Sequence, residues 1–178
     1  MIRFENALTS RALYRRLKQL YRSAFPANER PPLSFLKIQA RRGKCDMLAA
    51  LHRDDFAGLV ILVRHGDVIY VFFLAVEETL RGQGLGTEIL AMLARNHPGC
   101  RLMLCIENVH EPCDDLPLRL RRKAFYQRCG YREAGFTVTE SGVTYEMLST
   151  APVTWEDYRR LMTAFLGPTL FRYVHRPV

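Results

Sequence analysis

Apolar and polar positions in the N-terminal part of the chain predict a short strand followed by a helix. Residues 2–4 are the candidate strand. The helix should begin after Ser10, because serine is favoured as an N-cap and the apolar residues that follow recur at helical spacing. It should end near Phe25, since Pro26 disfavours helical geometry at the residue before it.

A second helix, starting at Pro31 or Pro32, is predicted to lead into three consecutive strands. The strand-like runs cover residues 47–52, 56–64 and 68–76. The segments between these runs are short and polar, and they contain aspartate and glycine, which suit tight turns. An antiparallel meander is therefore expected.

The C-terminal half of the chain alternates between helical and extended patterns. An apolar periodic stretch from Ile89 predicts a helix that stops at residues 97–99, and a strand follows at residues 101–106. Because a helix connects this strand to the one at residues 68–76, the two strands are predicted to be parallel neighbours.

A loop, a helix and a hairpin are predicted next. The loop covers residues 111–117, the helix residues 118–128, and the hairpin residues 131–136 and 143–148, with its turn at Ser141 and Gly142. Residues 150–178 then carry apolar and aromatic side chains at helical spacing, which predict a helix packed on the body of the protein. A dimer contact or a wall of an acceptor pocket is the alternative for this tail.

These elements predict a single α/β domain of the α+β type, with a central mixed, mostly antiparallel sheet flanked by helices. The core would cover residues 1–149, and a C-terminal helical extension would cover residues 150–178. With 178 residues, 48% of them hydrophobic and 25% charged, the chain fits one ordinary soluble domain. No apolar run approaches the roughly 20 residues that cross a bilayer, and the N-terminus lacks a signal-peptide pattern. We therefore expect a cytoplasmic protein without a membrane partner.

The cysteines argue against a disulfide framework and against a metal site. They are odd in number and include no CxxC pair: Cys45, Cys100, Cys105, Cys113 and Cys129. A zinc site from Cys100, Cys105, His110 and Cys113 is disfavoured, because an odd separation on one predicted strand would put Cys100 and Cys105 on opposite faces. No metal is expected.

The chain is basic, with 26 basic and 18 acidic residues, a net charge of +8 and a pI near 9.5. Basic residues cluster at residues 15–18, 41–44 and 119–123. Aromatic residues are not interleaved with these clusters as a nucleic-acid stacking platform requires. A solvated basic face is the simpler interpretation, and a polyanionic cofactor would gain from the same field.

The segment at residues 80–88, LRGQGLGTE, carries the clearest chemistry. It lies between the strand at residues 68–76 and the helix from Ile89. Gly82, Gly84 and Gly86 allow unusual backbone dihedrals and close approach to a ligand. The following helix adds backbone N–H groups and the positive end of its dipole, and Arg81 adds a guanidinium. A phosphate or pyrophosphate is the expected guest.

Spacing excludes two common phosphate loops. A Walker A loop counted from Gly82 needs Gly-Lys-Ser/Thr where Thr87, Glu88 and Ile89 stand. A dinucleotide fingerprint needs its third glycine at Thr87 or Ile89, depending on where it starts, and both positions fail.

Two segments together resemble the GNAT N-acetyltransferase superfamily. Arg81, Gly84 and Gly86 match that family's acyl-coenzyme A loop, with Val76 at the usual place on the preceding strand. Downstream, RRKAFYQRCGY at residues 121–131 resembles its second signature, carried by Phe125, Tyr126, Gly130 and Tyr131. The resemblance covers residues 49–148, and more loosely the N-terminal region.

The resemblance implies an N-acetyltransferase with acetyl-CoA as co-substrate and an amine as acceptor. It assigns coenzyme binding to the strand end and the glycine loop: Leu74, Val76, Arg81, Gly82, Gln83, Gly84, Leu85, Gly86 and Thr87. It also places Tyr126 near the coenzyme sulfur as general acid. One departure is Arg119, which stands where many family members have asparagine, so no role of that asparagine carries over.

The base and the acceptor site are less defined by the sequence. Glu107 and Glu77 each close a predicted strand and are candidate bases, directly or through water. Glu29 lies in a loop expected to overhang the acceptor and is a candidate for binding the amine, with pairing to Arg30 or Arg22 as the alternative. Two other functions stay open: a catalytically idle coenzyme-binding module, and an acyltransferase acting on an RNA-linked amine. A homodimer is possible from the sequence.

Overall fold

The structure is a computed structural model that describes residues 1–140, 142–171 and 174–175. Its internal contacts divide the chain into two compact units. The first unit contains residues 1–63 and 71–98, and the second contains residues 64–70 and 99–178. Each unit is described by itself below, and the single domain expected for residues 1–178 stays a prediction.

The strands of the first unit follow the predicted meander. They are β1 (Ile2–Asn6), β2 (Cys45–His52), β3 (Asp55–His65) and β4 (Val68–Val76), in the spatial order β1-β2-β3-β4. β1 pairs antiparallel with β2, and β2 pairs antiparallel with β3. The last residues of β3 and residues 68–70 of β4 belong to the second unit. The predicted strands are confirmed, each within a few residues of its expected ends.

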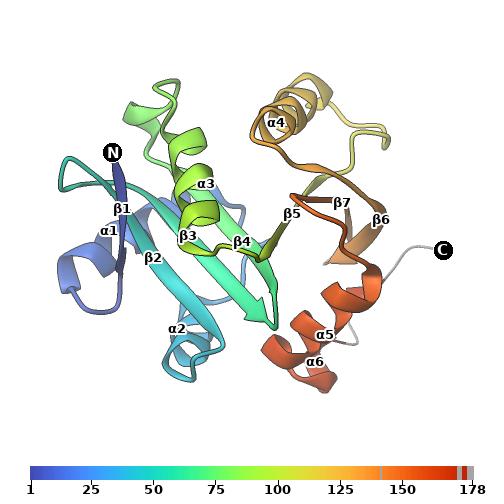
Figure 1. Cartoon of the computed structure of the whole chain (residues 1–178), viewed down its shortest axis with the longest axis horizontal. Coiled ribbons are helices and arrows are strands. Elements are labelled where there is room, and N and C mark those ends of the chain that lie inside the picture. The colour runs from blue at the N-terminus through green and yellow to red at the C-terminus, as the bar shows by residue number, and fades with distance from the viewer. Residues whose placement is uncertain (141, 172–173, 176–178) are drawn as a thin grey trace. The chain divides into compact units, whose positions relative to one another are not determined.

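Three α-helices complete the first unit: α1 (Arg11–Ala24), α2 (Leu33–Arg41) and α3 (Leu85–Asn96). Ser10 caps α1 as predicted, because its Oγ accepts a hydrogen bond from the Leu13 N–H at 3.4 Å. β3 is buried at consecutive positions, which requires cover on both of its faces. In Figure 1, α3 lies in front of the strands of this unit and α1 lies behind them.

A β-bulge interrupts the pairing of β2 with β3. Ala50 pairs with Gly58 and Leu51 pairs with Phe56, which leaves Ala57 as the extra residue. The Ala57 carbonyl accepts a hydrogen bond at 2.9 Å from the backbone N–H of Glu77, just beyond the end of β4. The bulge therefore anchors the point at which the chain leaves β4 for the glycine loop.

Gly58 should not tolerate a side chain. A Cβ at this position would lie 2.5 Å from the Ala75 carbonyl oxygen, a backbone atom that cannot swing away. Gly58→Ala should cost about 1–3 kcal/mol, because overpacking displaces the surrounding backbone. Urea unfolding of the wild type and the variant measures the cost, and equal unfolding midpoints would contradict this account.

The strands of the second unit run in the order β4-β5-β7-β6-β8. They include β5 (Arg101–Glu107), β6 (Arg132–Glu140), β7 (Val143–Ser149) and the short β8 (Val174–His175). β5 pairs parallel with residues 68–70 of β4, whereas the β5–β7, β6–β7 and β6–β8 pairs are antiparallel. The mixed, mostly antiparallel sheet is thus confirmed. The predicted hairpin turn falls partly on Ser141, which lies outside the described residues.

The helices of the second unit are α4 (Leu116–Arg128), α5 (Trp155–Leu166) and the short α6 (Pro168–Phe171). α4 starts two residues before its predicted start, because Pro117 sits in the first turn, where a missing N–H costs nothing. α5 confirms the predicted tail helix, and Thr154 and Asp157 form a capping box at its start. α5 buries four side chains: Tyr158, Leu161, Met162 and Phe165. In the part of the chain that is described, no helix has the length and apolarity to span a membrane.

In the second unit, the hydroxyls of Tyr158 and Tyr70 each contact a polar side chain. The Tyr158 hydroxyl donates to Glu140 Oε1, and Tyr70 Oη lies 2.9 Å from Cys105 Sγ. The rings of Tyr70 and Tyr158 meet edge to face at 5.7 Å. Burial raises the pKa of the Glu140 carboxyl, and the hydrogen bond from Tyr158 opposes that rise. Glu140 is therefore a carboxyl that the fold holds more easily when it is neutral.

Replacing Glu140 with glutamine should stabilise the protein at neutral pH. Because the folded pKa lies above the unfolded one, the stabilising contribution of this carboxyl is complete below the unfolded pKa and is lost as the pH rises through the folded pKa. Glu140→Gln should thus raise the melting temperature at pH 7.5 and leave it unchanged near pH 4. Melting curves at both pH values test this, with the exposed loop variant Glu111→Gln as control. A lower melting temperature for Glu140→Gln at pH 7.5 would refute it.

Candidate functional site

The glycine loop connects β4 to α3 in the first unit. A single 3₁₀ turn (Glu78–Leu80) comes first, and Gly82 and Gly84 follow, both at φ 78°. Gly84 is the left-handed N-cap of α3, which begins at Leu85. The predicted start at Ile89 was therefore wrong, and Gly86 lies inside the first helical turn with ordinary dihedrals. The left-handed Gly84 sets this boundary, and the buried Leu85 lies one turn before Ile89 on the same face of the helix.

The first turn of α3 presents backbone donors at the loop. The earliest hydrogen bond of the helix runs from the Glu88 N–H to the Gly84 carbonyl at 3.1 Å. The amides of Leu85, Gly86 and Thr87 come before it, where an α-helix offers no intrahelical acceptor. Gly84 has no Cβ and nothing within 4 Å of where one would be. An anion can therefore approach the positive end of the helix dipole closely.

Side chains and a surface pocket frame this loop. The exposed Arg81 donates from Nε to the Val76 carbonyl at 3.3 Å, and Gln83 donates to the Thr79 carbonyl at 3.4 Å. A pocket of about 470 Å³ runs along α3 from the loop, lined by Met1, Gln83, Gly84, Thr87, Glu88, Ala91 and Arg95. The space beside the loop is thus large enough for part of a nucleotide-containing ligand.

The end of β4 is buried on one side and partly open on the other. Val71, Phe73 and Ala75 are buried, whereas Leu74 and Val76 are partly exposed. Phe73 packs against Tyr21 and Phe25, with ring centroids 5.1 Å and 4.8 Å away. The buried positions therefore hold the strand in place and leave the Leu74 and Val76 side accessible within this unit.

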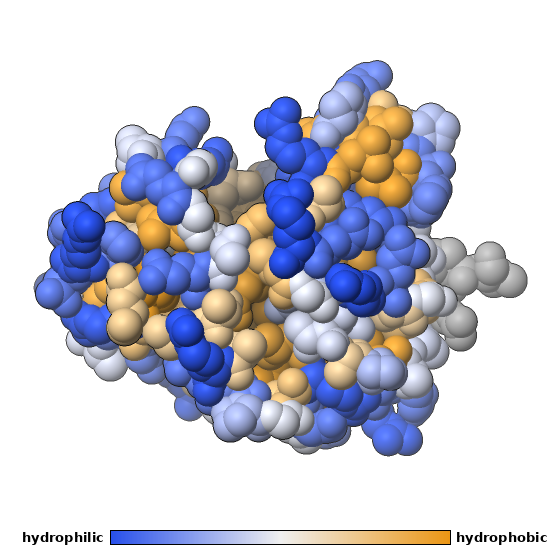
Figure 2. Space-filling view, turned by 45° about the horizontal axis from the view of Figure 1, so that its top comes forward, coloured by the Kyte–Doolittle hydropathy of each residue, from blue (hydrophilic) through white to orange (hydrophobic). Residues whose placement is uncertain are grey.

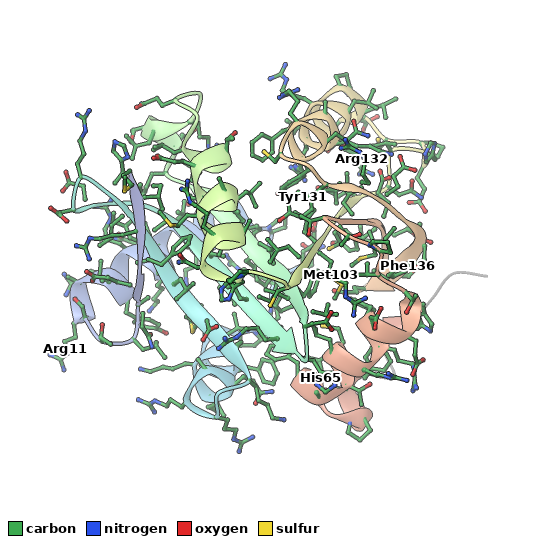
Figure 3. All side chains as sticks on the ribbon, in the orientation of Figure 1. Arg11, His65, Met103, Tyr131, Arg132 and Phe136 are labelled. Atoms are coloured by element: carbon green, nitrogen blue, oxygen red, sulfur yellow. The ribbon has the colours of Figure 1, made fainter. Side chains whose placement is uncertain are left out.

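Tyr126 lies half-buried on α4 in the second unit. Its ring packs against Phe125 at 5.0 Å and against Tyr131 at 5.9 Å. Figure 3 shows Tyr131 where α4 gives way to β6. Burial raises the pKa of the Tyr126 phenol to about 12, and the nearby Arg122 guanidinium opposes that rise. The hydroxyl is therefore protonated throughout the neutral range and is available as a donor.

Both candidate bases are ion-paired to arginine. Glu107 at the end of β5 pairs with Arg122 of α4 within the second unit. Glu77, directly after β4, pairs with Arg16 of α1 at 3.0 Å within the first unit. Each ion pair places its arginine on one of the two carboxylate oxygens.

Glu29 lies half-buried in the loop between α1 and α2. Its backbone N–H donates to the Pro26 carbonyl at 3.2 Å. The neighbouring Arg30 donates to the carbonyls of Tyr21, Arg22 and Phe25, the last at 3.2 Å, and so caps the C-terminal end of α1. This arginine cap was not predicted, because only the folded loop brings Arg30 back to the helix end.

The basic cluster at residues 119–123 is largely engaged in ion pairs. Arg119 pairs with Asp115 at 2.8 Å, Arg122 with Glu107, and Lys123 with Glu146 at 2.7 Å. Leu116, Leu118 and Leu120 of the same helix are exposed. Figure 2 shows an apolar patch ringed by hydrophilic residues in this region. The ion pairs of Arg119, Arg122 and Lys123 reduce the positive charge that α4 presents to a nucleic acid.

The thiols do not gather into a metal site within the described residues. No group of three or more His, Cys, Asp and Glu side chains there can hold a metal ion. The prediction that Cys100 and Cys105 share a strand was wrong, because β5 begins at Arg101. Burial raises the pKa of the Cys105 thiol above the ordinary thiol range, which keeps the thiol protonated.

A comparison with models of known protein families identifies the family of this chain. A family model described as an acetyltransferase (GNAT) domain matches residues 43–133, half of the chain. The chain belongs to the GNAT acetyltransferase family. No curated protein matches the chain.

Solved structures agree with this fold. A putative GNAT acetyltransferase from Bacteroides thetaiotaomicron aligns with a TM-score of 0.74 at 22% identity, over 93% of this chain and 98% of that one. An aminoglycoside 6'-N-acetyltransferase complexed with coenzyme A gives 0.66 at 18% identity, over 86% and 99%. Naa50 from Arabidopsis thaliana, in complex with the bisubstrate analogue CoA-Ac-MVNAL, gives 0.59 at 14% identity, over 84% and 98%. These likenesses show the fold of the chain.

Proposed function

We propose that the protein transfers an acetyl group from acetyl-CoA to a primary amine, directly within a ternary complex. The observation that carries the proposal is the left-handed Gly84 at the N-terminus of α3, directly after β4. Membership of the GNAT family supports it. So does the coenzyme A bound to the aminoglycoside acetyltransferase that shares the fold.

In this proposal the glycine loop holds the pyrophosphate of the coenzyme. The amides of Leu85, Gly86 and Thr87 donate to the phosphate oxygens, and Gly82 and Gly84 keep the approach open. Arg81 and Gln83 add side-chain donors at the mouth of the loop. The backbone of Leu74 and Val76, on the open side of β4, aligns the pantetheine arm and its thioester.

The chemistry requires an uncharged amine and a stabilised thiolate. The amine nitrogen attacks the thioester carbonyl, the tetrahedral intermediate collapses, and the C–S bond breaks. Tyr126 is assigned to the departing sulfur. Because its pKa is about 12, above that of an ordinary thiol, complete proton transfer from the phenol is uphill. Tyr126 therefore acts first as a hydrogen-bond donor to the developing thiolate.

Removal of the ammonium proton is assigned to Glu107 or Glu77, directly or through water. Glu29 is assigned to hold the incoming amine. The two glutamates can be told apart with Glu107→Gln and Glu77→Gln, since the variant that lacks the base should lose turnover most at low pH, where the amine is most fully protonated.

The loop is tested by acetyl-CoA binding. Gly84→Ala should weaken binding at least tenfold, because a Cβ disfavours the left-handed cap and crowds the anion. Arg81→Ala should weaken it less. Gly99→Ala is the matched control, since Gly99 has φ 79° and open space but lies after α3, away from the loop. Titration calorimetry with all three variants decides, and equal losses for Gly84→Ala and Gly99→Ala would defeat the loop assignment.

Turnover is tested with a panel of amines. Small amines, peptides and aminoglycosides are incubated with acetyl-CoA, and the release of free thiol is followed. Thiol release with one of these amines supports the proposal. Tight acetyl-CoA binding without turnover on any amine would instead favour a catalytically idle coenzyme-binding module.

A further inference from the structure

A bulge in β6 opens a pocket within the second unit. Glu133 pairs with Leu148 and Thr137 with Glu146, so three residues of β6 lie opposite one residue of β7. Gly135, inside the bulge, has φ 78°, which lets the strand leave the ladder. The resulting pocket has a volume of about 290 Å³. It is lined by Asn108, His110, Glu133, Gly135, Phe136, Thr137, Glu146 and Met147.

Glu146 brings an unsatisfied oxygen to this pocket. Its side chain is 8% exposed, and Oε2 accepts a hydrogen bond from Lys123 Nζ at 2.7 Å. Oε1 is buried and has no hydrogen-bond partner among the residues that the structure describes. A buried polar atom left without a partner costs about 1–3 kcal/mol. Glu146 Oε1 thus lacks a hydrogen-bond donor.

Lys123, Glu133 and Glu146 form a cluster whose net charge favours the binding of a cation. Lys123 Nζ also lies 2.6 Å from Glu133 Oε1, so one ammonium is shared by two carboxylates. The three groups together carry one net negative charge when all are ionised. Glu133 is 58% exposed, so this side of the cluster is open to an incoming group. A single positive donor would balance the cluster and satisfy Glu146 Oε1.

The other residues that line the pocket include two apolar side chains. Phe136 and Met147 also line the pocket but are buried, and the Phe136 ring packs against Trp155 and Tyr158, with centroids 6.3 Å and 6.4 Å away. Figure 3 shows Phe136 on the α5 side of β6.

Other ligand classes fit less well. Two carboxylates repel an anion. A divalent metal ion needs several oxygen or nitrogen ligands, and the described residues contain no group of three that could supply them. The Lys123 ammonium on both carboxylates would also oppose a doubly charged ion at close range.

We propose that this pocket, the bulge pocket, binds a primary alkylammonium group through Glu146 and Glu133. The ammonium donates to Glu146 Oε1 and to Glu133. A free aliphatic diamine and a lysine side chain both carry this group.

Calorimetry on the full chain without acetyl-CoA tests the proposal. The probes are 1,5-diaminopentane, Nα-acetyl-lysine methylamide and the uncharged 1,5-pentanediol. Saturable binding of either amine at millimolar concentration, without binding of the diol, is the expected result. Binding of the diamine alone identifies the free amine as the ligand, and binding of both identifies the shared alkylammonium group.

Variants locate the site. Glu146→Gln and Glu133→Gln should each weaken amine binding about tenfold or more, whereas Glu156→Gln, on the exposed face of α5, should leave it unchanged. Glu133 is exposed, so Glu133→Gln keeps the test valid if Glu146→Gln unfolds. Absence of saturable amine binding, equal binding of the diol, or unchanged affinity in Glu133→Gln would each overturn the proposal. The Glu133→Gln and Glu146→Gln variants, rather than amine binding alone, separate this pocket from the acceptor site of the proposed function.

Discussion

Replacing Tyr126 with phenylalanine should lower the rate of acetyl transfer about 10²–10⁴-fold, the range for loss of a positioned acid. The variant keeps the ring, and so keeps its contacts with Phe125 and Tyr131. It loses only the hydroxyl that donates to the departing thiolate. Steady-state turnover measures the fall, and calorimetry with acetyl-CoA should show unchanged affinity, since the effect belongs to the transition state.

The pH dependence separates this role from that of the base. Burial holds the pKa of Tyr126 at about 12, so the donor is protonated at every pH below 10. Any rise in rate between pH 6 and pH 10 therefore reports deprotonation of the amine or the base. Tyr126→Phe should scale this profile down without moving it. Tyr14→Phe on α1, whose ring faces Lys37, is the matched control. An unchanged rate in Tyr126→Phe would show that Tyr126 does not assist departure of the thiolate.

Replacing Lys123 with methionine should destabilise the protein by about 3–5 kcal/mol, the cost of leaving a buried ionic partner uncompensated. Lys123 is 10% exposed and Glu146 is 8% exposed, and the two lie 2.7 Å apart. Methionine fills similar space but leaves Glu146 without its ammonium. Urea unfolding at pH 7.5 measures the loss, and Arg121→Met, an exposed position on the same helix, is the control.

Two further measurements test the cause of that loss. The double variant Lys123→Met with Glu146→Leu should recover most of the stability, because an apolar pair of similar size replaces the ionic one. Lys123 also holds the pKa of Glu133 below its ordinary value, through a hydrogen bond and charge attraction. That part of the stabilisation is complete above the unfolded pKa and is lost as the pH falls through the folded pKa. The penalty of Lys123→Met should therefore shrink in acid, and a constant penalty would contradict the ionic account.

The sequence predicted the parts of the fold that depend on local pattern. The cap at Ser10, the three-strand meander and the parallel return of β5 followed from residue types, turn lengths and periodicity. The start of α3 did not, because the helix begins at Leu85, directly after the left-handed Gly84, whereas Ile89 was the expected start. Leu85 lies on the buried face one turn before Ile89, but the glycines on either side of it weaken the helical pattern there.

The candidate site likewise has one part that could be predicted from the sequence and another that could not. The glycine loop could be predicted because its chemistry lies in consecutive residues. The cluster of Lys123, Glu133 and Glu146 could not, because it joins α4, β6 and β7 across up to 23 residues. The bulge pocket depends on a register shift between β6 and β7 that no single residue indicates, although Gly135 allows it.

Neighbouring residues on α4 hold two different strands. Arg122 reaches Glu107 at the end of β5, and Lys123 reaches Glu146 in β7. Consecutive residues point about 100° apart around a helix axis. The two ion pairs together therefore restrict rotation of α4 about its axis in either direction. The two ion pairs thereby hold the orientation of Tyr126, which lies one turn after Arg122 on the same helix. The direction of the Tyr126 hydroxyl therefore depends on the orientation of α4 as a whole. Substitutions at Glu107 or Glu146 should change that direction.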